Sequence, residues 1–259
     1  MGGLPLAMGL TMALSAAAPD ASGSAGAEPY ASARRRLLGE VARDVAECAA
    51  STGCERLSDV VTVALLSVPR HEFVPPELLP HAWENRALPI GLDQTISQPT
   101  IVALMTELLE LAATDTVLEV GTGSGYQAAV LATVVPRGYV HTIEIVPELA
   151  EEARQRLRRL GYLNVDVVTG DGHAGLPAVA PFDGIMVTAV SPEVPPALLA
   201  QLAPGAKLVM PLSAAGGEQW LTVVRRGPAG DWVRTRVLPV RFVPLTGGRG
   251  HTPGYQQAH

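Results

Sequence analysis

A glycine-rich loop at residues 119–125 constrains the fold of this chain more than any other feature. The loop reads Glu-Val-Gly-Thr-Gly-Ser-Gly from Glu119 to Gly125. The apolar run Thr116–Val120 before its first glycine predicts a buried strand, and the run Tyr126–Val135 after it predicts a helix. Glycines at such a junction allow a tight turn and let a ligand approach the backbone closely. The loop therefore predicts a strand–turn–helix unit with a ligand site at the turn.

The spacing of these glycines argues against a dinucleotide as the ligand. The dinucleotide fingerprint has glycines at its first, third and sixth positions. Gly121 and Gly123 match the first and third positions, but Tyr126 stands at the sixth. The loop leaves room for a ligand that has no pyrophosphate.

The chain around the loop alternates short apolar runs with amphipathic segments, which predicts an α/β fold with a mainly parallel sheet. A helix opens at Pro147, and a short one spans Pro195–Leu202. After Leu212 the alternation stops, so we expect two neighbouring strands that give the sheet an antiparallel end. The further predicted strands are Tyr139–Ile145, Val165–Thr169, Gly184–Thr188, Lys207–Leu212, Trp220–Arg225 and Trp232–Val240.

The first part of the chain predicts two helices, near Arg34–Ala50 and Leu57–Leu66, followed by a Pro-rich connector over 68–80 that excludes helix. Residues 1–33 are interpreted as an extension, 34–247 as the catalytic domain and 248–259 as a flexible tail. Leu4–Ala18 is apolar like a secretory signal, but no Lys or Arg precedes it. We expect a cytoplasmic protein with this extension, and export is the alternative.

Acidic residues lie at the ends of three successive predicted strands, on the side where open α/β sheets bind ligands. Glu144 is placed to accept hydrogen bonds from both hydroxyls of a ribose, and Glu119 to face a cationic amino acid group. Asp171 and Gly172 are placed beside an adenine. Each acid taken alone fits a solvated loop residue better than a ligand-binding one. Together they favour a nucleoside, and S-adenosylmethionine, which has adenosine, a sulfonium and no phosphate, fits.

Several motifs in order make the chain similar to the protein-L-isoaspartate (D-aspartate) O-methyltransferase family, from about Val68 to Gly247. They are Val68-Pro-Arg-His71, Phe73-Val-Pro75, Leu88-Pro-Ile-Gly91, Gln94-Thr-Ile-Ser-Gln-Pro99, the glycine loop with Tyr126-Gln-Ala-Ala129, Gly170-Asp-Gly172 and Leu238-Pro-Val-Arg-Phe-Val-Pro-Leu245.

The resemblance implies a Rossmann-like seven-stranded methyltransferase sheet with helices on both faces. It also implies methyl transfer from S-adenosylmethionine to the free α-carboxylate of L-isoaspartyl and D-aspartyl residues in damaged proteins, which starts repair through a succinimide. By the same resemblance Ser97 is the catalytic residue, Thr95 and Ile96 bind substrate, and Thr246 lines the pocket. The expected cofactor site comprises Glu119, Gly121, Thr122, Gly123, Ser124, Gly125, Glu144, Asp171, Gly172 and Thr246.

Ser97 has a second interpretation, as the cap of a helix that starts near Pro99. A carboxylate substrate is already ionised at neutral pH, so the reaction needs no general base. His71 is accordingly interpreted as structural and His173 as a surface loop residue, while Trp83 fits either the core or a peptide contact.

The remaining features bear on partners. A formal net charge of −6 argues against a nucleic-acid partner. No segment predicts stable membrane association. We expect a monomer that acts on isoaspartyl proteins. Cys48 and Cys54 are too few for a zinc site and predict two thiols; no metal is expected. The alternatives are a small-molecule carboxyl or hydroxyl methyltransferase on the same fold, and a non-catalytic homologue that binds the cofactor.

Overall fold

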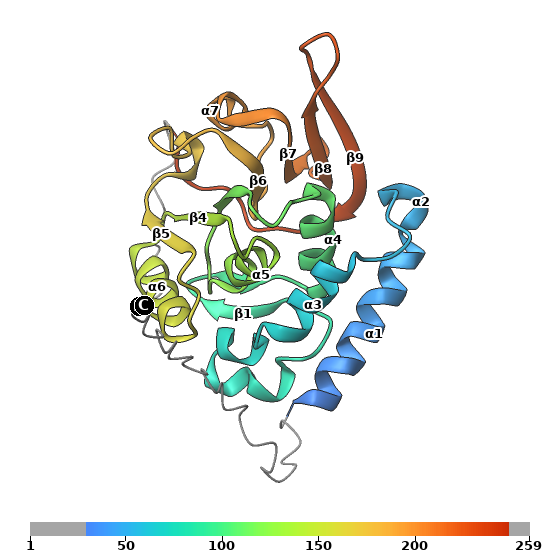
Figure 1. Ribbon diagram of the computed structural model, residues 1–259, viewed down its shortest axis with the longest axis vertical. Coiled ribbons are helices and arrows are strands. Elements are labelled where there is room, and N and C mark those ends of the chain that lie inside the picture. Colours follow the sequence, from blue (N-terminus) through green and yellow to red (C-terminus); the bar gives the residue numbers. More distant parts are fainter. Residues whose placement is uncertain (1–29, 249–259) are drawn as a thin grey trace, which may run out of the picture.

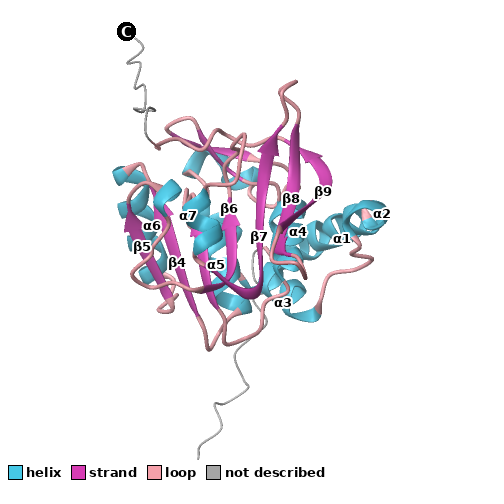
Figure 2. Ribbon diagram, turned by 90° about the horizontal axis from the view of Figure 1, so that it is seen from above, coloured by secondary structure: helices cyan, strands magenta, loops and turns pink. Residues whose placement is uncertain are grey.

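The computed structural model describes residues 30–248 as a seven-stranded sheet with helices on both faces (Figures 1 and 2). The strands run in the order β5-β4-β3-β6-β7-β8-β9. The first five in that order are parallel, and β8 is antiparallel to both of its neighbours. The strands are β3 (Thr116–Val120), β4 (Tyr139–Glu144), β5 (Val165–Thr169), β6 (Phe182–Val187), β7 (Leu202–Ser213), β8 (Gln219–Arg226) and β9 (Trp232–Val240). The predicted fold class is confirmed.

Alternate residues of each strand face opposite sides, and each side has its own core. Val117 belongs to the larger core, which is shared with α1, α3, α4, α5 and α6, whereas Leu118 belongs to the smaller one, which includes α7. The helices are α1 (Ala31–Glu47), α2 (Ala49–Thr52), α3 (Asp59–Ser67), α4 (Pro99–Leu109), α5 (Tyr126–Val134), α6 (Pro147–Arg159) and α7 (Pro196–Ala200). No described helix is both long enough and apolar enough to span a membrane.

The Pro-rich connector departs from its prediction, because it contains two short 3-10 helices, Arg70–Phe73 and Pro76–His81. Pro76 stands at the start of its 3-10 helix, where a backbone N–H would have no partner within the helix, so its missing N–H costs no hydrogen bond. The predicted boundary at residue 33 falls within α1, which begins at Ala31. The rest of the predicted extension, and the predicted tail beyond Gly248, lie outside the described residues.

A small hairpin that the sequence analysis did not predict, β1 (Leu88–Gly91) with β2 (Gln94–Ile96), precedes α4. Its turn holds Leu92 at φ 51° and Asp93 at φ 56°, the left-handed geometry of tight hairpin turns, without a glycine at either position. Because β2 ends at Ile96 and α4 begins at Pro99, this hairpin fixes where Ser97 lies.

Candidate active site

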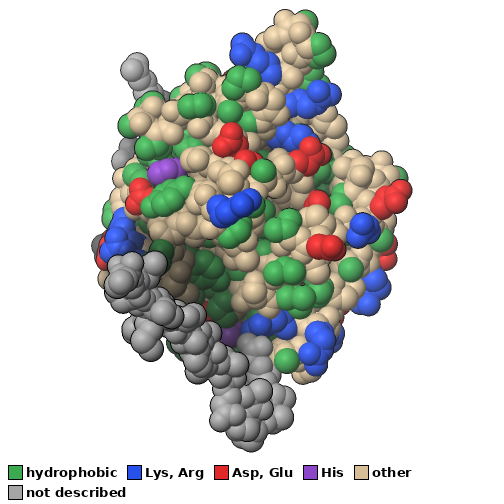
Figure 3. Space-filling model, viewed as in Figure 1, with side chains coloured by type: hydrophobic (Ala, Val, Ile, Leu, Met, Phe, Trp, Pro, Cys, Tyr) green, Lys and Arg blue, Asp and Glu red, His purple; other side chains and the backbone are tan. Residues whose placement is uncertain are grey.

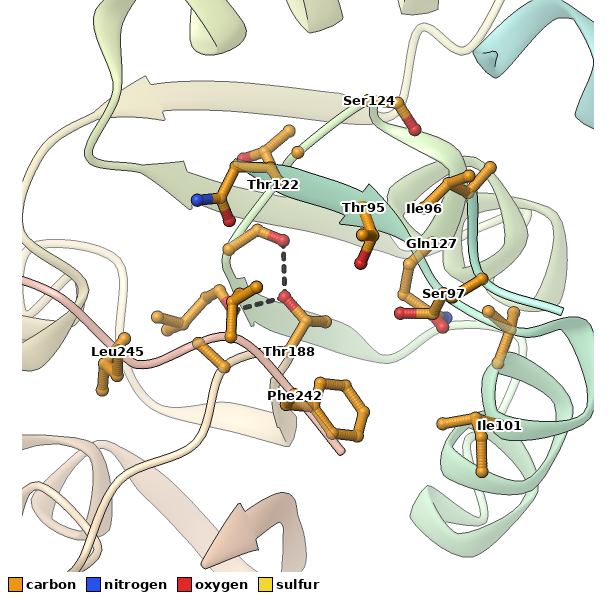
Figure 4. Close-up of a pocket in the computed structure, with 18 of the residues that line it drawn as sticks. Thr95, Ile96, Ser97, Ile101, Thr122, Ser124, Gln127, Thr188, Phe242 and Leu245 are labelled. Atoms are coloured by element: carbon orange, nitrogen blue, oxygen red, sulfur yellow. Dashed lines mark hydrogen bonds between the residues drawn. The ribbon is translucent and has the colours of Figure 1, made fainter. Parts of the chain in front are cut away.

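One cavity of about 1040 Å³ opens where the chain order of the sheet reverses, at the carboxyl ends of β3 and β6. This crevice is where open α/β sheets bind ligands. In Figure 4, Thr95, Ile96, Ser97 and Gln127 lie along one wall of the cavity, and Thr122, Thr188 and Leu245 lie across from them. The volume is sufficient for a nucleoside cofactor together with one residue of a peptide.

The glycine loop forms the floor of the cavity and lies in close contact with Thr188, the residue that follows β6. Gly121 has φ +97°, and a Cβ at this position would stand 2.3 Å from Thr188 Oγ1. The Thr188 hydroxyl lies 2.7 Å from the Gly121 carbonyl oxygen, to which it donates, and 3.0 Å from that of Val120 (Figure 4). Glycine is therefore required at residue 121 by both backbone conformation and space.

Glu144 lies on the cavity wall in a fixed orientation. Its carboxylate accepts hydrogen bonds from the backbone N–H of Gly123 at 2.9 Å and of Val146 at 3.0 Å, and the residue is 6% exposed. A carboxylate offers about four acceptor positions, so two bonds leave capacity for the vicinal hydroxyls of a ribose. The residues present thus fit a nucleoside cofactor.

Glu119, by contrast, is fully buried and does not line the cavity. Burial raises its pKa to about 8, against the effect of the hydrogen bond from Thr142, so the carboxyl is neutral at pH 7. Thr142 Oγ1 donates to it at 2.5 Å and lies 2.7 Å from the hydroxyl of Thr122, which does line the cavity. Any effect of Glu119 on a bound ligand passes through these two hydroxyls.

Two other predicted cofactor residues also lie outside the cavity lining, namely Gly125 and Asp171. Gly125 caps α5 with φ 87° and packs against Leu157. Asp171 accepts from the backbone N–H of Gly248 at 2.7 Å and of His173 at 2.9 Å. Burial opposes ionisation of Asp171, but these amides and the His173 ring prevail and lower its pKa. The neighbouring Gly172 does line the cavity.

Ser97 lines the cavity, half-buried, and its hydroxyl forms no hydrogen bond with any residue of the described chain. The N-cap of α4 is Gln98, whose side chain makes no capping bond, and the first-turn N–H of Thr100 donates to Asn85 Oδ1 at 3.2 Å. The alternative interpretation of Ser97 as the cap is therefore wrong. Thr95, Ile96 and Thr246 also line the cavity, as do the loop residues from Gly121 to Ser124.

The far wall is the segment 241–246, called here the C-terminal strap, of which the sequence predicted only Thr246 as a site residue. Val190 N–H donates to the Val243 carbonyl oxygen at 2.8 Å, and Leu245 N–H donates to that of Val190 at 2.8 Å. Gln219 adds two side-chain bonds to the backbone of Phe242. Among the cavity residues that the sequence did not predict, Gln127 alone stands out in the sequence, as a polar residue within the apolar run of α5. In the structure it is only 8% exposed.

The remaining singled-out residues lie away from the cavity. The His71 ring packs 4.3 Å from that of Tyr30, and Trp83 is a core residue at 4% exposure, which decides between its two interpretations. Both cysteines are free thiols.

Comparisons with known proteins agree with this geometry. Residues 50–250 match the family model described as Protein-L-isoaspartate(D-aspartate) O-methyltransferase. The chain is 49% identical over 235 residues to protein-L-isoaspartate O-methyltransferase 2 of Syntrophobacter fumaroxidans. This alignment covers 91% of this chain and 94% of the relative. It is 52% identical over 213 residues to the protein of the same name from Nitrosococcus oceani, with 82% of this chain and 96% of the relative covered.

Solved structures agree as well. A protein-L-isoaspartate O-methyltransferase superposes with a TM-score of 0.73 at 32% identity, over 83% of this chain and 66% of the other. A Plasmodium falciparum structure assigned the same activity, in complex with S-adenosyl-L-homocysteine, superposes with a TM-score of 0.70 at 22% identity over 82% of this chain and 98% of the other, and supports the fold.

Proposed function

Because the chain belongs to the protein-L-isoaspartate(D-aspartate) O-methyltransferase family, we propose that its cavity binds S-adenosylmethionine against Glu144 and the glycine loop and a damaged polypeptide against Ser97. The enzyme methylates the free α-carboxylate of isoaspartyl residues. The observation that carries the assignment of Ser97 is its hydroxyl, which lines the cavity and has no partner in the described chain.

The cofactor supplies a methyl group on a sulfonium, and the protein's task is to orient the acceptor. A carboxylate with a pKa near 4 is ionised at neutral pH without help. The one carboxylate among the described residues that line the cavity, Glu144, is held by two backbone N–H groups. Holding both reactants in line lowers the barrier of a bimolecular reaction by about 7–11 kcal/mol in all. Ser97 supplies a part of this by donating one hydrogen bond that fixes the direction of the acceptor carboxylate.

A neutral donor suits this step better than a cation. Negative charge on the acceptor decreases as the methyl bond forms, so a strong positive charge beside it would stabilise the ground state more than the transition state. The neighbouring backbone amide nitrogen then attacks the carbonyl of the product ester and methanol leaves, which gives a succinimide. Its hydrolysis returns part of the material to normal aspartate. That closure needs no residue of the enzyme.

The role of Ser97 is tested by Ser97→Ala on one isoaspartyl peptide with methyl-labelled cofactor. We expect kcat to fall on the order of 10²-fold, as when a single positioned donor is removed from an active site, while the Kd for the cofactor stays within about twofold. Ser67→Ala is the matched control, because Ser67 bonds only within α3. A Ser97→Ala enzyme with the kcat of the control would remove Ser97 from the mechanism.

We further propose a single catalytic domain that begins with α1 at Ala31 and extends to residue 247. It acts as a monomer in the cytoplasm, where the cofactor is made, without a nucleic-acid partner. A net charge of −6 supports the last point. Light scattering should give a mass near 27.0 kDa. A concentration-independent mass of twice that value would exclude the monomer.

A further inference from the structure

The β8–β9 hairpin and the strap that follows it carry a concentration of positive charge in an acidic protein. Residues 219–241 contain five arginines and one acid, Asp231, in a chain with a formal net charge of −6. All five are exposed, and none forms an ion pair with an acidic residue of the described chain. They are Arg225, Arg226, Arg234, Arg236 and Arg241. Figure 3 shows basic side chains on this projecting hairpin.

Three of these arginines lie on one face of the hairpin with regular spacing. The register pairs Arg226 with Trp232, Val224 with Arg234, and Thr222 with Arg236. Directly paired residues share a face of an antiparallel ladder. Arg234 and Arg236 of β9 therefore lie about 6.7 Å apart on one face, and Arg226 of β8 lies beside Trp232, at the next position of the same face. An extended polypeptide repeats its side chains on one face with the same period.

The line of charge leads to the cavity. Beyond Val240 the chain continues from β9 into the strap, whose first residue, Arg241, lines the cavity. From Arg236 to Arg241 is five residues, or roughly 16 Å along an extended chain. A polypeptide with one residue in the cavity can therefore reach the hairpin with a segment about five residues away.

Protection of an open sheet edge is a simpler role for charges on β9, which pairs only with β8 in the described sheet. However, charged side chains of either sign, or a mixture of both, protect a sheet edge. Edge protection does not account for arginines without acids on the face that leads to the cavity.

We propose that Arg226, Arg234 and Arg236 form a docking track for acidic, extended segments of the damaged polypeptide, so that the enzyme prefers isoaspartyl sites flanked by alternating acidic residues. The proposal rests on the proposed function and adds a class of substrate to it. Two guanidinium groups already lie near aromatic rings, 5.6 Å from Trp232 for Arg226 and 5.9 Å from Trp220 for Arg236, which limits the freedom they lose on binding.

The test compares KM for three peptides with the same isoaspartyl core. One carries a neutral extension, and the others carry glutamates about five, seven and nine residues from the isoaspartate, on its amino or its carboxyl side. We expect one acidic peptide to show a KM about 3- to 10-fold lower than the neutral peptide at low salt, since exposed ion pairs contribute little each. The advantage should disappear near 1 M salt.

The double variant R234Q/R236Q should lose this preference and bring the KM ratio close to one. The matched control is R35Q/R137Q, which removes two exposed arginines without ion pairs in the described chain. Arg35 lies in the first turns of α1, at the end of the molecule opposite the hairpin (Figure 1), and Arg137 precedes β4 at the amino edge of the sheet. The control should keep the preference.

Equal KM values for all three peptides in the wild type would overturn the track and leave the proposed function standing. Methylation of none of them would overturn both. A single-stranded oligonucleotide that inhibits the wild type but not R234Q/R236Q, with no preference among the peptides, would assign the arginines to nucleic acid instead.

Discussion

At the scale of single residues, two glutamates at the ends of neighbouring strands have opposite environments. Glu144 is held by two backbone amides at the cavity wall, whereas Glu119 is enclosed and bonded only to Thr142. Both follow the sequence pattern of acids near a glycine loop. Only the structure shows that Glu144 can bind a ligand, whereas Glu119 contacts the glycine loop only through Thr142 and Thr122.

Glu144→Gln should weaken cofactor binding about 10- to 100-fold, because a charge-assisted pair of bonds to a ribose is replaced by weaker neutral ones. Calorimetric titration with S-adenosylmethionine measures the Kd. Glu148→Gln, an exposed residue on the first turn of α6, is the control. A Glu144→Gln Kd equal to that of the control, in a protein with unchanged Tm, would place the ribose elsewhere.

Glu119 should make stability depend on pH. Its folded pKa of about 8 lies above the ordinary value of 4.5, so between these values the folded state holds a proton that the unfolded state has lost. The contribution of Glu119 to stability is therefore complete below pH 4.5 and decreases as pH rises to 8, by about 1.4 kcal/mol per unit.

Urea unfolding without cofactor, from pH 5 to pH 9, tests this effect. The free energy of unfolding of Glu119→Gln minus that of the wild type should increase with pH and level off above 8. The same difference for Glu148→Gln should stay flat. A pH-independent difference for Glu119→Gln would mean that the carboxyl ionises normally despite its burial.

At the scale of elements, the far wall depends on a side chain that substitutes for a missing strand pairing. Gln219 Oε1 accepts from Phe242 N–H at 2.6 Å, and its Nε2 donates to the Phe242 carbonyl oxygen at 3.2 Å. Gln219 begins β8 and pairs with Val240 at the end of β9. It therefore extends the ladder by one position and holds the start of the strap.

Gln219→Ala should loosen the strap and raise KM for the isoaspartyl peptide several-fold, with a smaller change in kcat, because the wall is displaced while Ser97 stays in place. Steady-state kinetics on one peptide separate the two constants. Gln155→Ala, on the exposed face of α6, is the control. Unchanged KM in Gln219→Ala would show that the strap is held by its bonds to Val190 alone.

The elements that the sequence predicted are those with a local cause. Apolar runs between breakers predicted β3 to β6 closely, and Pro147 marked the start of α6. The β1–β2 hairpin was missed because its turn uses Leu92 and Asp93 where Asn and Gly are usual. β7 begins at Leu202, earlier than predicted, because Leu202 pairs with Phe182 of β6; Pro204 and Gly205 lie in the irregularity between this pair and the pair of Lys207 with Gly184.

At the scale of the whole molecule, the cavity joins segments that are far apart in sequence. β2, the glycine loop, the end of β6 and the strap all contribute residues, and no local pattern shows that they meet. The resemblance supplied Ser97 and Thr246. It did not supply Gln127, Thr188 or Gln219, whose roles arise from contacts across the fold.

Selective methylation of isoaspartate is tested by comparing two substrates with one enzyme. Purified wild-type protein is given methyl-labelled S-adenosylmethionine and either a peptide with one isoaspartate or its twin with normal aspartate, and released methanol is counted. The account predicts label transfer to the isoaspartyl peptide and none above background to the twin. Equal transfer to both peptides, or none to either while the cofactor still binds, would contradict it.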